Sequence, residues 1–202
     1  MSEPLSLPDN FNPETCMLSK MTEYGTFHES RSAASLAEHL VASGTPQDLE
    51  LAEKVLDAVL NCQERREGDP HFGNFLWMRE DDAVGDLNAV EFNLERLIPM
   101  MLQHGDRLSP EMRDRVLEAI RLGLEEIRSL NVLVAYSNIT ALDILNTCLG
   151  GELLDDPEIA ERGYNKLIEW IAYTDRSGTL QEFNSPGYSS GVIRFLKRLA
   201  DE

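Results

Sequence analysis

Three helix starts of one design constrain the fold of this chain most strongly. Thr45-Pro46, Ser109-Pro110 and Asp156-Pro157 each place a hydrogen-bonding side chain directly before a proline. Such a side chain caps the free amide groups at a helix N-terminus, and proline suits the first helical position because no amide proton is needed there. The last two starts continue alike, with Glu and then an apolar residue. The sequence therefore predicts a repeated helical unit.

Two kinds of helix alternate along the chain. The segment after Ser109 carries apolar residues on one face only, at the spacing of an amphipathic helix: Met112, Val116, Ile120, Leu124 and Ile127. The segment from Asn138 to Cys148 is apolar on most sides, which is typical of a helix buried all round. This alternation predicts antiparallel helical hairpins stacked in an inner and an outer layer.

The arrangement of the chain follows from these patterns. Residues 1–29 lack helical periodicity and contain no long alternation of polar and apolar residues, so we interpret them as an extended N-terminal arm without strands. Residues 30–202 form a single helical-hairpin domain in this interpretation. The predicted fold class is all-α, with antiparallel helical hairpins in an arc or partial (α/α) toroid.

The last hairpin has predictable details. We expect Gly150-Gly151 to end its first helix, because glycine is common at helix C-termini. The second helix begins at Asp156-Pro157 and carries an apolar face that we predict to be buried: Ile159, Tyr164, Leu167, Ile168 and Ile171.

Charge and composition argue against several classes of protein. The net charge of −18 disfavours nucleic acid, because binding phosphates requires clustered Lys and Arg. The three cysteines show no C-x-x-C spacing, and Cys62 and Cys148 lie on apolar helix faces as expected of buried thiols. The N-terminus lacks the features of a signal peptide, and no apolar run is long enough to cross a bilayer. We therefore expect a cytoplasmic protein that binds neither nucleic acid nor membrane.

Three loops are rich in asparagine and aromatic residues: Gly73–Trp77, Tyr136–Ile139 and Glu182–Tyr188. If the apolar helices run parallel in an inner layer, these loops gather at one rim. Helix N-termini would then point their positive dipole ends at the rim and favour an anionic group of a ligand. We predict the functional rim at residues 71–79, 136–140 and 182–188.

The alternating hairpins and the loops GNFLW, YSNI and EFNSPGY resemble the α/α-toroid (six-hairpin) superfamily, in which helical hairpins surround a substrate cleft. The resemblance covers residues 30–202 and is architectural. It implies a glycoside hydrolase, a polysaccharide lyase or a terpene-alcohol dehydratase-isomerase, and the fold alone does not choose among them. A closed ring needs more helices than this sequence predicts. The chain is thus an incomplete ring, a fragment, or a subunit that completes its cavity in a homo-oligomer.

The candidate catalytic residues are Glu182, Tyr188, His71 and Tyr136. A carboxyl group held against Phe183 and Tyr188 can act as general acid or base. In a lyase, His71 or a tyrosine would take the α-proton of a uronate, and a tyrosine would protonate the leaving oxygen. Hydrolysis of a glycosidic bond needs a second carboxylate, for which the chain offers Glu80, Asp81, Asp86, Glu91 and Asp143.

The candidate substrate-binding residues are Asn74, Trp77, Arg79, Asn138 and Asn184. An asparagine can neutralise a uronate carboxylate, Arg79 can clamp an acidic group, and Trp77 can stack on a sugar ring. Each also has a structural interpretation, as a helix cap, a turn amide or a core side chain. The sequence contains no metal-binding motif and no phosphate-binding glycine loop, so we expect neither metal nor cofactor.

The leading functional hypothesis is a carbohydrate-active enzyme of the lyase or hydrolase type, acting on a saccharide or another small molecule. One alternative is a non-catalytic helical-repeat scaffold that binds a protein or peptide. Another is a dehydratase or cyclase that acts on an apolar, terpenoid-like substrate and uses Cys148. The enzyme predicts a cleft where Glu182, Asn138 and His71 converge, whereas the scaffold predicts asparagine side chains that cap backbone groups.

Overall fold

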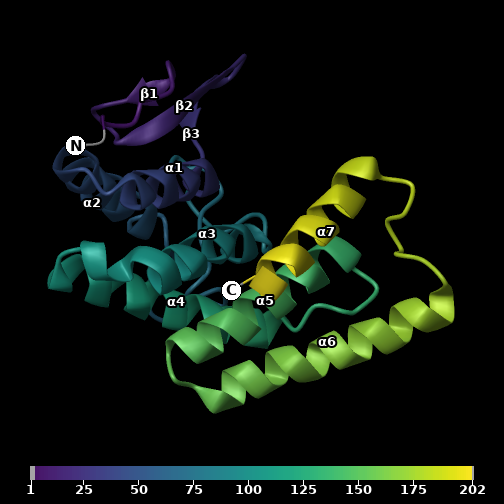
Figure 1. Ribbon diagram of the computed structural model, residues 1–202. Coiled ribbons are helices and arrows are strands. Elements are labelled where there is room, and N and C mark those ends of the chain that lie inside the picture. The colour runs from purple at the N-terminus through teal and green to yellow at the C-terminus, as the bar shows by residue number, and fades with distance from the viewer. Residues whose placement is uncertain (1–2, 202) are drawn as a thin grey trace. The chain divides into compact units, whose positions relative to one another are not determined.

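The computed structural model describes residues 3–201, which form seven α-helices and one short three-stranded sheet (Figure 1). The prediction of a mainly helical chain is confirmed. The structure divides into two compact units at Gly123, within helix α4, and each unit is described by itself. The toroid arrangement stays a prediction.

The first unit begins with the sheet and continues with three complete helices. Helix α1 packs against α2 and α3, and strand β2 lies against α1. The elements are β1 (Phe11–Asn12), β2 (Met17–Thr22), β3 (Gly25–His28), α1 (Ser30–Ser43), α2 (Pro46–Leu60), α3 (Ala89–His104), a single 3-10 turn η1 (Gly105–Arg107) and the first part of α4 (Pro110–Leu130).

The sheet corrects the prediction of an arm without strands. Residues 11–28 form an antiparallel sheet in the order β1-β2-β3, with a tight turn before Gly25, whose φ is 138°. The sequence pattern did not indicate these strands, because few of their side chains are buried. Met17 is the one fully buried residue of β2, and the rest of that strand shows no alternating pattern.

All three predicted helix starts are confirmed. The Thr45 side chain accepts a hydrogen bond from the Asp48 amide at 3.2 Å. Ser109 and Asp156 cap α4 and α6 in the same way. Gly44 ends α1 in the left-handed conformation with φ 71°, which glycine adopts without a steric penalty.

The long loop between α2 and α3 is fixed onto α4 by backbone contacts. Gln63 Nε2 donates to Gly73 O and to Ala119 O, both at 2.9 Å. Gly73 has φ 97°, and a Cβ at this position would overlap with Leu122 O. Only glycine satisfies both conditions, so this part of the loop is held by close approach of two backbones.

The second unit consists of the end of α4 and helices α5 (Ser137–Leu153), α6 (Pro157–Ser177) and α7 (Pro186–Asp201). Helix α5 packs against both α6 and α7 (Figure 1). Every residue from Ser137 to Gly151 is buried, which confirms the prediction for this apolar helix.

Gly150-Gly151 does not end α5, contrary to the prediction. The helix continues to Leu153, and the turn that follows contains Asp155 at φ 52°. Gly151 instead allows α6 to approach, since a Cβ there would overlap with the backbone of Ala160. The two glycines are packing positions inside the helix.

The apolar face predicted to be buried in α6 is largely the exposed one. Tyr164, Ile168 and Ile171 are exposed. The buried residues of α6 are Ile159, Gly163, Lys166 and Trp170. A hydrophobic pattern cannot identify this face, because it contains a glycine and a lysine that is buried through its charge partner.

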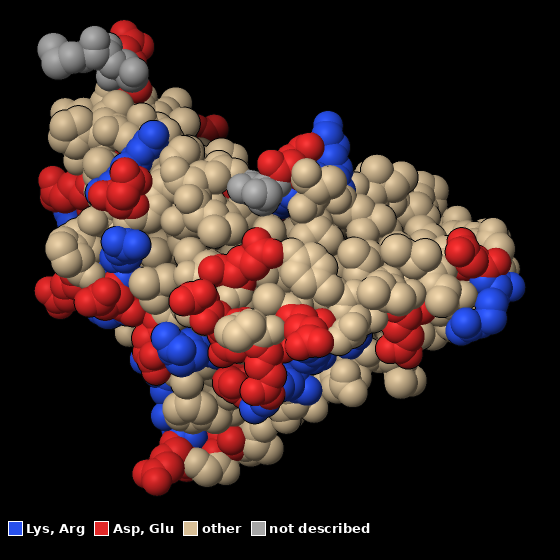
Figure 2. All heavy atoms as spheres, turned by 60° about the horizontal axis from the view of Figure 1, so that its bottom comes forward, with Lys and Arg blue, Asp and Glu red and all other residues tan. Residues whose placement is uncertain are grey.

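The surface reflects the acidic composition of the chain. On the face shown in Figure 2, acidic and basic side chains are interspersed. Arg128 of α4, for example, lies 2.6 Å from Glu125 and 3.2 Å from Glu158. Within residues 3–201, no helix combines the length and apolar character that a membrane span requires.

The close contact between α5 and α6 can be tested with Gly163→Ala. A Cβ at Gly163 would lie 2.7 Å from both Cys148 N and Thr147 Oγ1, so the helices would have to separate. We expect a loss of about 1–3 kcal/mol in the free energy of unfolding, measured by urea denaturation. Gly187→Ala in α7 is the control, because a Cβ there meets nothing within 4 Å. Equal stability of the two variants would contradict this packing.

Candidate functional site

In the first unit, the N-terminal turns of α1 and α3 lie side by side. Asn93 Nδ2 of α3 donates to Ser30 Oγ of α1 at 3.1 Å, and Ser30 Oγ donates to Leu76 O at 2.8 Å. Asn93 is fully buried, and its Oδ1 has no hydrogen-bond partner among the described residues. Trp77 lies at this end, with its ring edge-on to that of Phe92 and the centroids 5.6 Å apart.

An arginine covers the two aromatic rings. The Arg31 guanidinium lies 5.2 Å from the Trp77 centroid and 5.1 Å from that of Phe92, and it also contacts Glu29 at 3.4 Å. These distances fit cation–π contacts. A sugar that stacks on this face of Trp77 would have to displace the guanidinium.

Asn74, a predicted substrate ligand, is used inside the protein. It is fully buried, its Nδ2 donates to Leu87 O at 3.1 Å, and its Oδ1 accepts from the amides of Phe75 and Val90 at 2.7 and 3.1 Å. These bonds fix the loop to the first turn of α3. They support the structural interpretation, and a ligand contact by Asn74 stays a prediction.

His71 and Arg79 lie at opposite ends of the predicted first loop. The His71 amide donates to Asp69 Oδ1 at 2.9 Å, so this residue takes part in a turn. The Arg79 amide donates to His28 O at 2.9 Å. The Arg79 guanidinium makes no hydrogen bond or ion pair within the described part of the chain, and it lines a surface groove.

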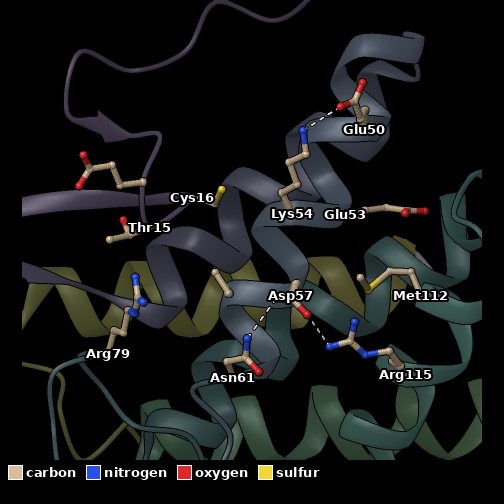
Figure 3. Close-up of a pocket in the computed structure, with 12 residues that line it drawn as sticks. Thr15, Cys16, Glu50, Glu53, Lys54, Asp57, Asn61, Arg79, Met112 and Arg115 are labelled. Carbon is tan, nitrogen blue, oxygen red and sulfur yellow. Dashed lines mark hydrogen bonds and ion pairs between the residues drawn. The ribbon is translucent and has the colours of Figure 1, made fainter.

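This groove of about 550 Å³ lies between the β1–β2 turn, α2 and α4 (Figure 3). Most of its charges are paired within its own wall. Lys54 Nζ lies 2.7 Å from Glu50 Oε1, and Arg115 Nη2 lies 2.6 Å from Asp57 Oδ1. The hydrogen bond from Lys54 lowers the pKa of Glu50. Paired, solvent-exposed charges of this kind give the groove little preference for a ligand of either sign.

A polar chain with the connectivity of a catalytic triad crosses the sheet. Ser19 Oγ lies 3.2 Å from His28 Nε2, and His28 Nδ1 lies 2.6 Å from Glu80 Oε1. Asn12 Nδ2 also lies 3.3 Å from Nε2, and because an amide nitrogen can only donate, Nε2 is an acceptor. His28 is buried, and Ser19 does not line the groove. We interpret this series of hydrogen-bonded side chains as a structural link between the sheet and the loop before α3.

Glu80 contacts His28 through both of its carboxylate oxygens. Its second oxygen, Oε2, accepts from the His28 amide at 2.9 Å. Burial alone would raise the pKa of Glu80, but the hydrogen bonds from the His28 ring and amide outweigh burial and lower the pKa. The sequence gives no sign of this pair, because it depends on the position of a strand 52 residues away in the chain.

In the second unit, two of the predicted loops come together at the N-terminal end of α5. Glu182 Oε2 accepts from the Asn138 amide at 2.8 Å, and Ser137 Oγ accepts from the Gln181 amide at 3.1 Å. Glu182 thereby caps the first turn of α5, where the helix dipole favours a carboxylate. Glu182 Oε1 has no hydrogen-bond partner within residues 3–201.

The two loops that meet here carry exposed aromatic side chains and a buried amide. Tyr136, Phe183 and Tyr188 are exposed, as is Asn184. Asn138 is buried, and its Oδ1 has no hydrogen-bond partner in the part of the chain that is described. An unpaired buried oxygen costs about 1–3 kcal/mol, so a hydrogen bond from a water or a ligand would stabilise this position.

The structure thus places the predicted residues in two groups. His71, Asn74, Trp77 and Arg79 belong to the first unit, and Tyr136, Asn138, Glu182, Asn184 and Tyr188 belong to the second. Within the described residues, no three His, Cys, Asp or Glu side chains are placed to hold a metal ion.

Comparisons with known proteins place the chain in a family without giving it an activity. A family model described as a domain of unknown function, DUF8769, matches residues 3–197. Comparison with curated proteins and with solved structures gave no significant match. The function therefore has to be argued from the site itself.

The link between Glu80 and His28 can be tested with Glu80→Gln. We expect the variant to lower the free energy of unfolding by about 1–3 kcal/mol at neutral pH, because a charged acceptor is lost. Since the pKa of Glu80 is lower in the folded protein than in the unfolded chain, this stabilisation is present above the ordinary glutamate pKa and is lost as pH falls through the folded value.

Urea unfolding of both proteins at about pH 7 and about pH 3 measures this effect, and the difference between them should shrink at the lower pH. Glu23→Gln in the exposed turn after β2 is the control and should match the wild type. A constant difference at both pH values would show that Glu80 does not act through its charge.

Proposed function

We propose that this chain, a member of the DUF8769 family, is a carbohydrate-active protein that binds a saccharide at the N-terminal end of α5. One observation carries the proposal. Asn138 Oδ1 is buried and has no hydrogen-bond partner among the described residues, in the helix turn that Glu182 caps, and the same two loops carry three exposed aromatic side chains. This combination supplies both kinds of contact that a sugar needs.

The chemistry of a sugar fits these groups. Each ring has an apolar face of C–H groups, and aromatic side chains such as Phe183 and Tyr188 pack against flat apolar surfaces. Sugar hydroxyls are donors as well as acceptors. Asn138 Oδ1 and Glu182 Oε1 are acceptors without a partner among residues 3–201, and a hydroxyl could donate to either of them.

Catalysis is the finer part of this proposal. In a glycoside hydrolase, Glu182 would act as general acid or base together with a second carboxylate. In a lyase, Tyr136 or Tyr188 would take the α-proton of a uronate or protonate the leaving oxygen. Both mechanisms use a side chain from the same pair of loops, so substitutions in these loops test them together.

A second candidate is a non-catalytic scaffold that binds a protein partner. Its support is the exposed stripe of Tyr164, Ile168 and Ile171 on α6, whose spacing matches one face of a helix. The scaffold hypothesis also predicts asparagine side chains that cap backbone groups, and Asn74 does so. A homo-oligomer that completes a shared cavity belongs instead to the saccharide proposal, and light scattering measures self-association directly.

The dehydratase or cyclase alternative has less support. Cys148 is fully buried, and burial raises the pKa of its thiol to about 12. The thiolate is the nucleophilic form, and at neutral pH this side chain stays protonated. An apolar substrate would therefore meet an unreactive thiol.

The saccharide proposal is tested by Phe183→Ala and Tyr188→Ala. Isothermal titration calorimetry with a panel of neutral and uronate oligosaccharides identifies a ligand of the wild type. Each variant should then bind it about 5- to 10-fold more weakly, the effect of losing one important aromatic contact of about 1–1.4 kcal/mol. The matched control is Tyr24→Ala, because Tyr24 is 84% exposed in the turn after β2 and should not affect binding.

Two outcomes would overturn the proposal. The first is a wild-type protein that binds no member of the panel, and the second is equal weakening by Tyr24→Ala and Tyr188→Ala. In either case the scaffold becomes the better proposal. A triple substitution of Tyr164, Ile168 and Ile171 to Ser, which removes the exposed stripe, then tests the scaffold by its effect on self-association in light scattering.

A further inference from the structure

The groove beside the β1–β2 turn has two walls of different character. In the helix wall, which α2 and α4 form, the opposite charges are paired: Lys54 with Glu50 at 2.7 Å, and Arg115 with Asp57 at 2.6 Å. The fifth charged side chain of this wall, Glu53, accepts a hydrogen bond from the Ser109 amide at 2.8 Å. The charged groups of the helix wall therefore have partners within the protein.

The turn wall consists of Glu14, Thr15 and Cys16 from the β1–β2 turn, together with Arg79. Figure 3 shows Thr15 and Arg79 on the side of the groove away from Arg115. The Glu14 carboxylate and the Arg79 guanidinium make no hydrogen bond or ion pair with another described residue. Thr15 Oγ1 is shielded from solvent and also has no hydrogen-bond partner among residues 3–201. One anionic group, one cationic group and one hydroxyl are thus open to a ligand in this wall.

The two open charges have opposite signs, which limits the kind of ligand that suits the groove. A ligand with a net charge of one sign would be attracted by either Glu14 or Arg79 and repelled by the other. A molecule with an ammonium group and a carboxylate group can pair with both. The guanidinium of Arg79 matches a carboxylate in shape and charge, and the carboxylate of Glu14 accepts hydrogen bonds from an ammonium. A zwitterion therefore fits the turn wall.

The remaining groups of the groove favour a peptide among zwitterions. Ala58 and Met112 also line the groove and offer apolar surface to side chains of a ligand. The hydroxyl of Thr15 can donate and accept, and a peptide group offers both an N–H and a carbonyl. The volume of about 550 Å³ lies in the range of sites for small molecules.

We propose that this groove binds a short peptide with free termini, whose carboxylate contacts Arg79 and whose ammonium contacts Glu14. The apolar side chains of the peptide lie against Ala58 and Met112, and its peptide group lies beside Thr15. Both ion pairs are exposed, so water and salt screen them and each contributes modestly to affinity. The groove belongs to the first unit and uses no residue of the saccharide site proposed in the second, so either proposal can fail without the other.

Cys16 reports whether the groove is occupied. It lines the groove and is half-buried, whereas Cys62 and Cys148 are 1% and 0% exposed. Alkylation of the folded protein by iodoacetamide, followed by mass spectrometry, therefore measures access to Cys16. Leucyl-leucine at about five times its Kd should slow this alkylation about 6-fold, because bound peptide shields the thiol. Calorimetric titration of the same protein gives the Kd and should show one saturable site.

Three peptides and two variants separate the two ionic contacts. The peptides are leucyl-leucine, its N-acetyl form, which lacks the ammonium, and its C-terminal amide, which lacks the carboxylate. Arg79→Gln and Glu14→Gln should each weaken binding of free leucyl-leucine about 3- to 5-fold, the effect of one exposed ion pair. Arg79→Gln should leave binding of the amide unchanged, and Glu14→Gln should leave binding of the N-acetyl form unchanged, because in each case the partner group is already missing.

Arg113→Gln and Glu23→Gln are the matched controls. Both positions are exposed and lie outside the groove, and the substitutions change the net charge by the same amounts as Arg79→Gln and Glu14→Gln. The controls should leave binding unchanged. The proposal is overturned if the wild type shows no saturable binding of leucyl-leucine, if the three peptides bind equally well, or if Arg79→Gln and Arg113→Gln have equal effects.

Discussion

The close contact between α5 and α6 determines the rest of the second unit. Gly163 has no side chain, and this allows the backbone of α6 to reach that of α5 at Cys148. At that separation Arg162 and Lys166 reach Asp143, and these two ion pairs offset the cost of burying its carboxylate. Because α5 is buried along most of its length, its polar side chains depend on partners from neighbouring segments. Asp143 has two such partners, whereas Asn138 Oδ1 has none among the described residues.

The first unit depends on the same kind of backbone contact. Gly73 lies directly on the carbonyl of Leu122, and Gln63 and Asn74 hold the loop there through hydrogen bonds to backbone groups. The loop predicted to bind a ligand thus also fastens α3 and α4 to each other, through Asn74 at the first turn of α3 and Gly73 at α4. A ligand contact by this loop stays a prediction, and at its end Arg31 covers the ring of Trp77.

The sequence was sufficient for features that arise within a few residues. The cap at Thr45 and the buried character of α5 were predicted, since each depends on local composition. The sheet, the face of α6 and the burial of Lys166 were not, because each is decided by a segment distant in the sequence. The residues of the candidate sites divide in the same way, into those that the local sequence indicates and those that distant segments determine. The loops at Asn138 and Glu182 were predicted to meet, whereas nothing in the sequence marked Lys166 as part of a cavity.

The saccharide site proposed in the second unit suits a ligand without charge. The loops that carry Asn138 and Glu182 contain no Lys or Arg between residues 136 and 138 or between 182 and 188, and they contribute one carboxylate. A uronate bound there would place a second negative charge near Glu182 without a cation from these loops to offset it. A neutral sugar carries no such penalty. If the saccharide proposal holds, this charge distribution favours hydrolysis of a neutral glycan over elimination from a uronate.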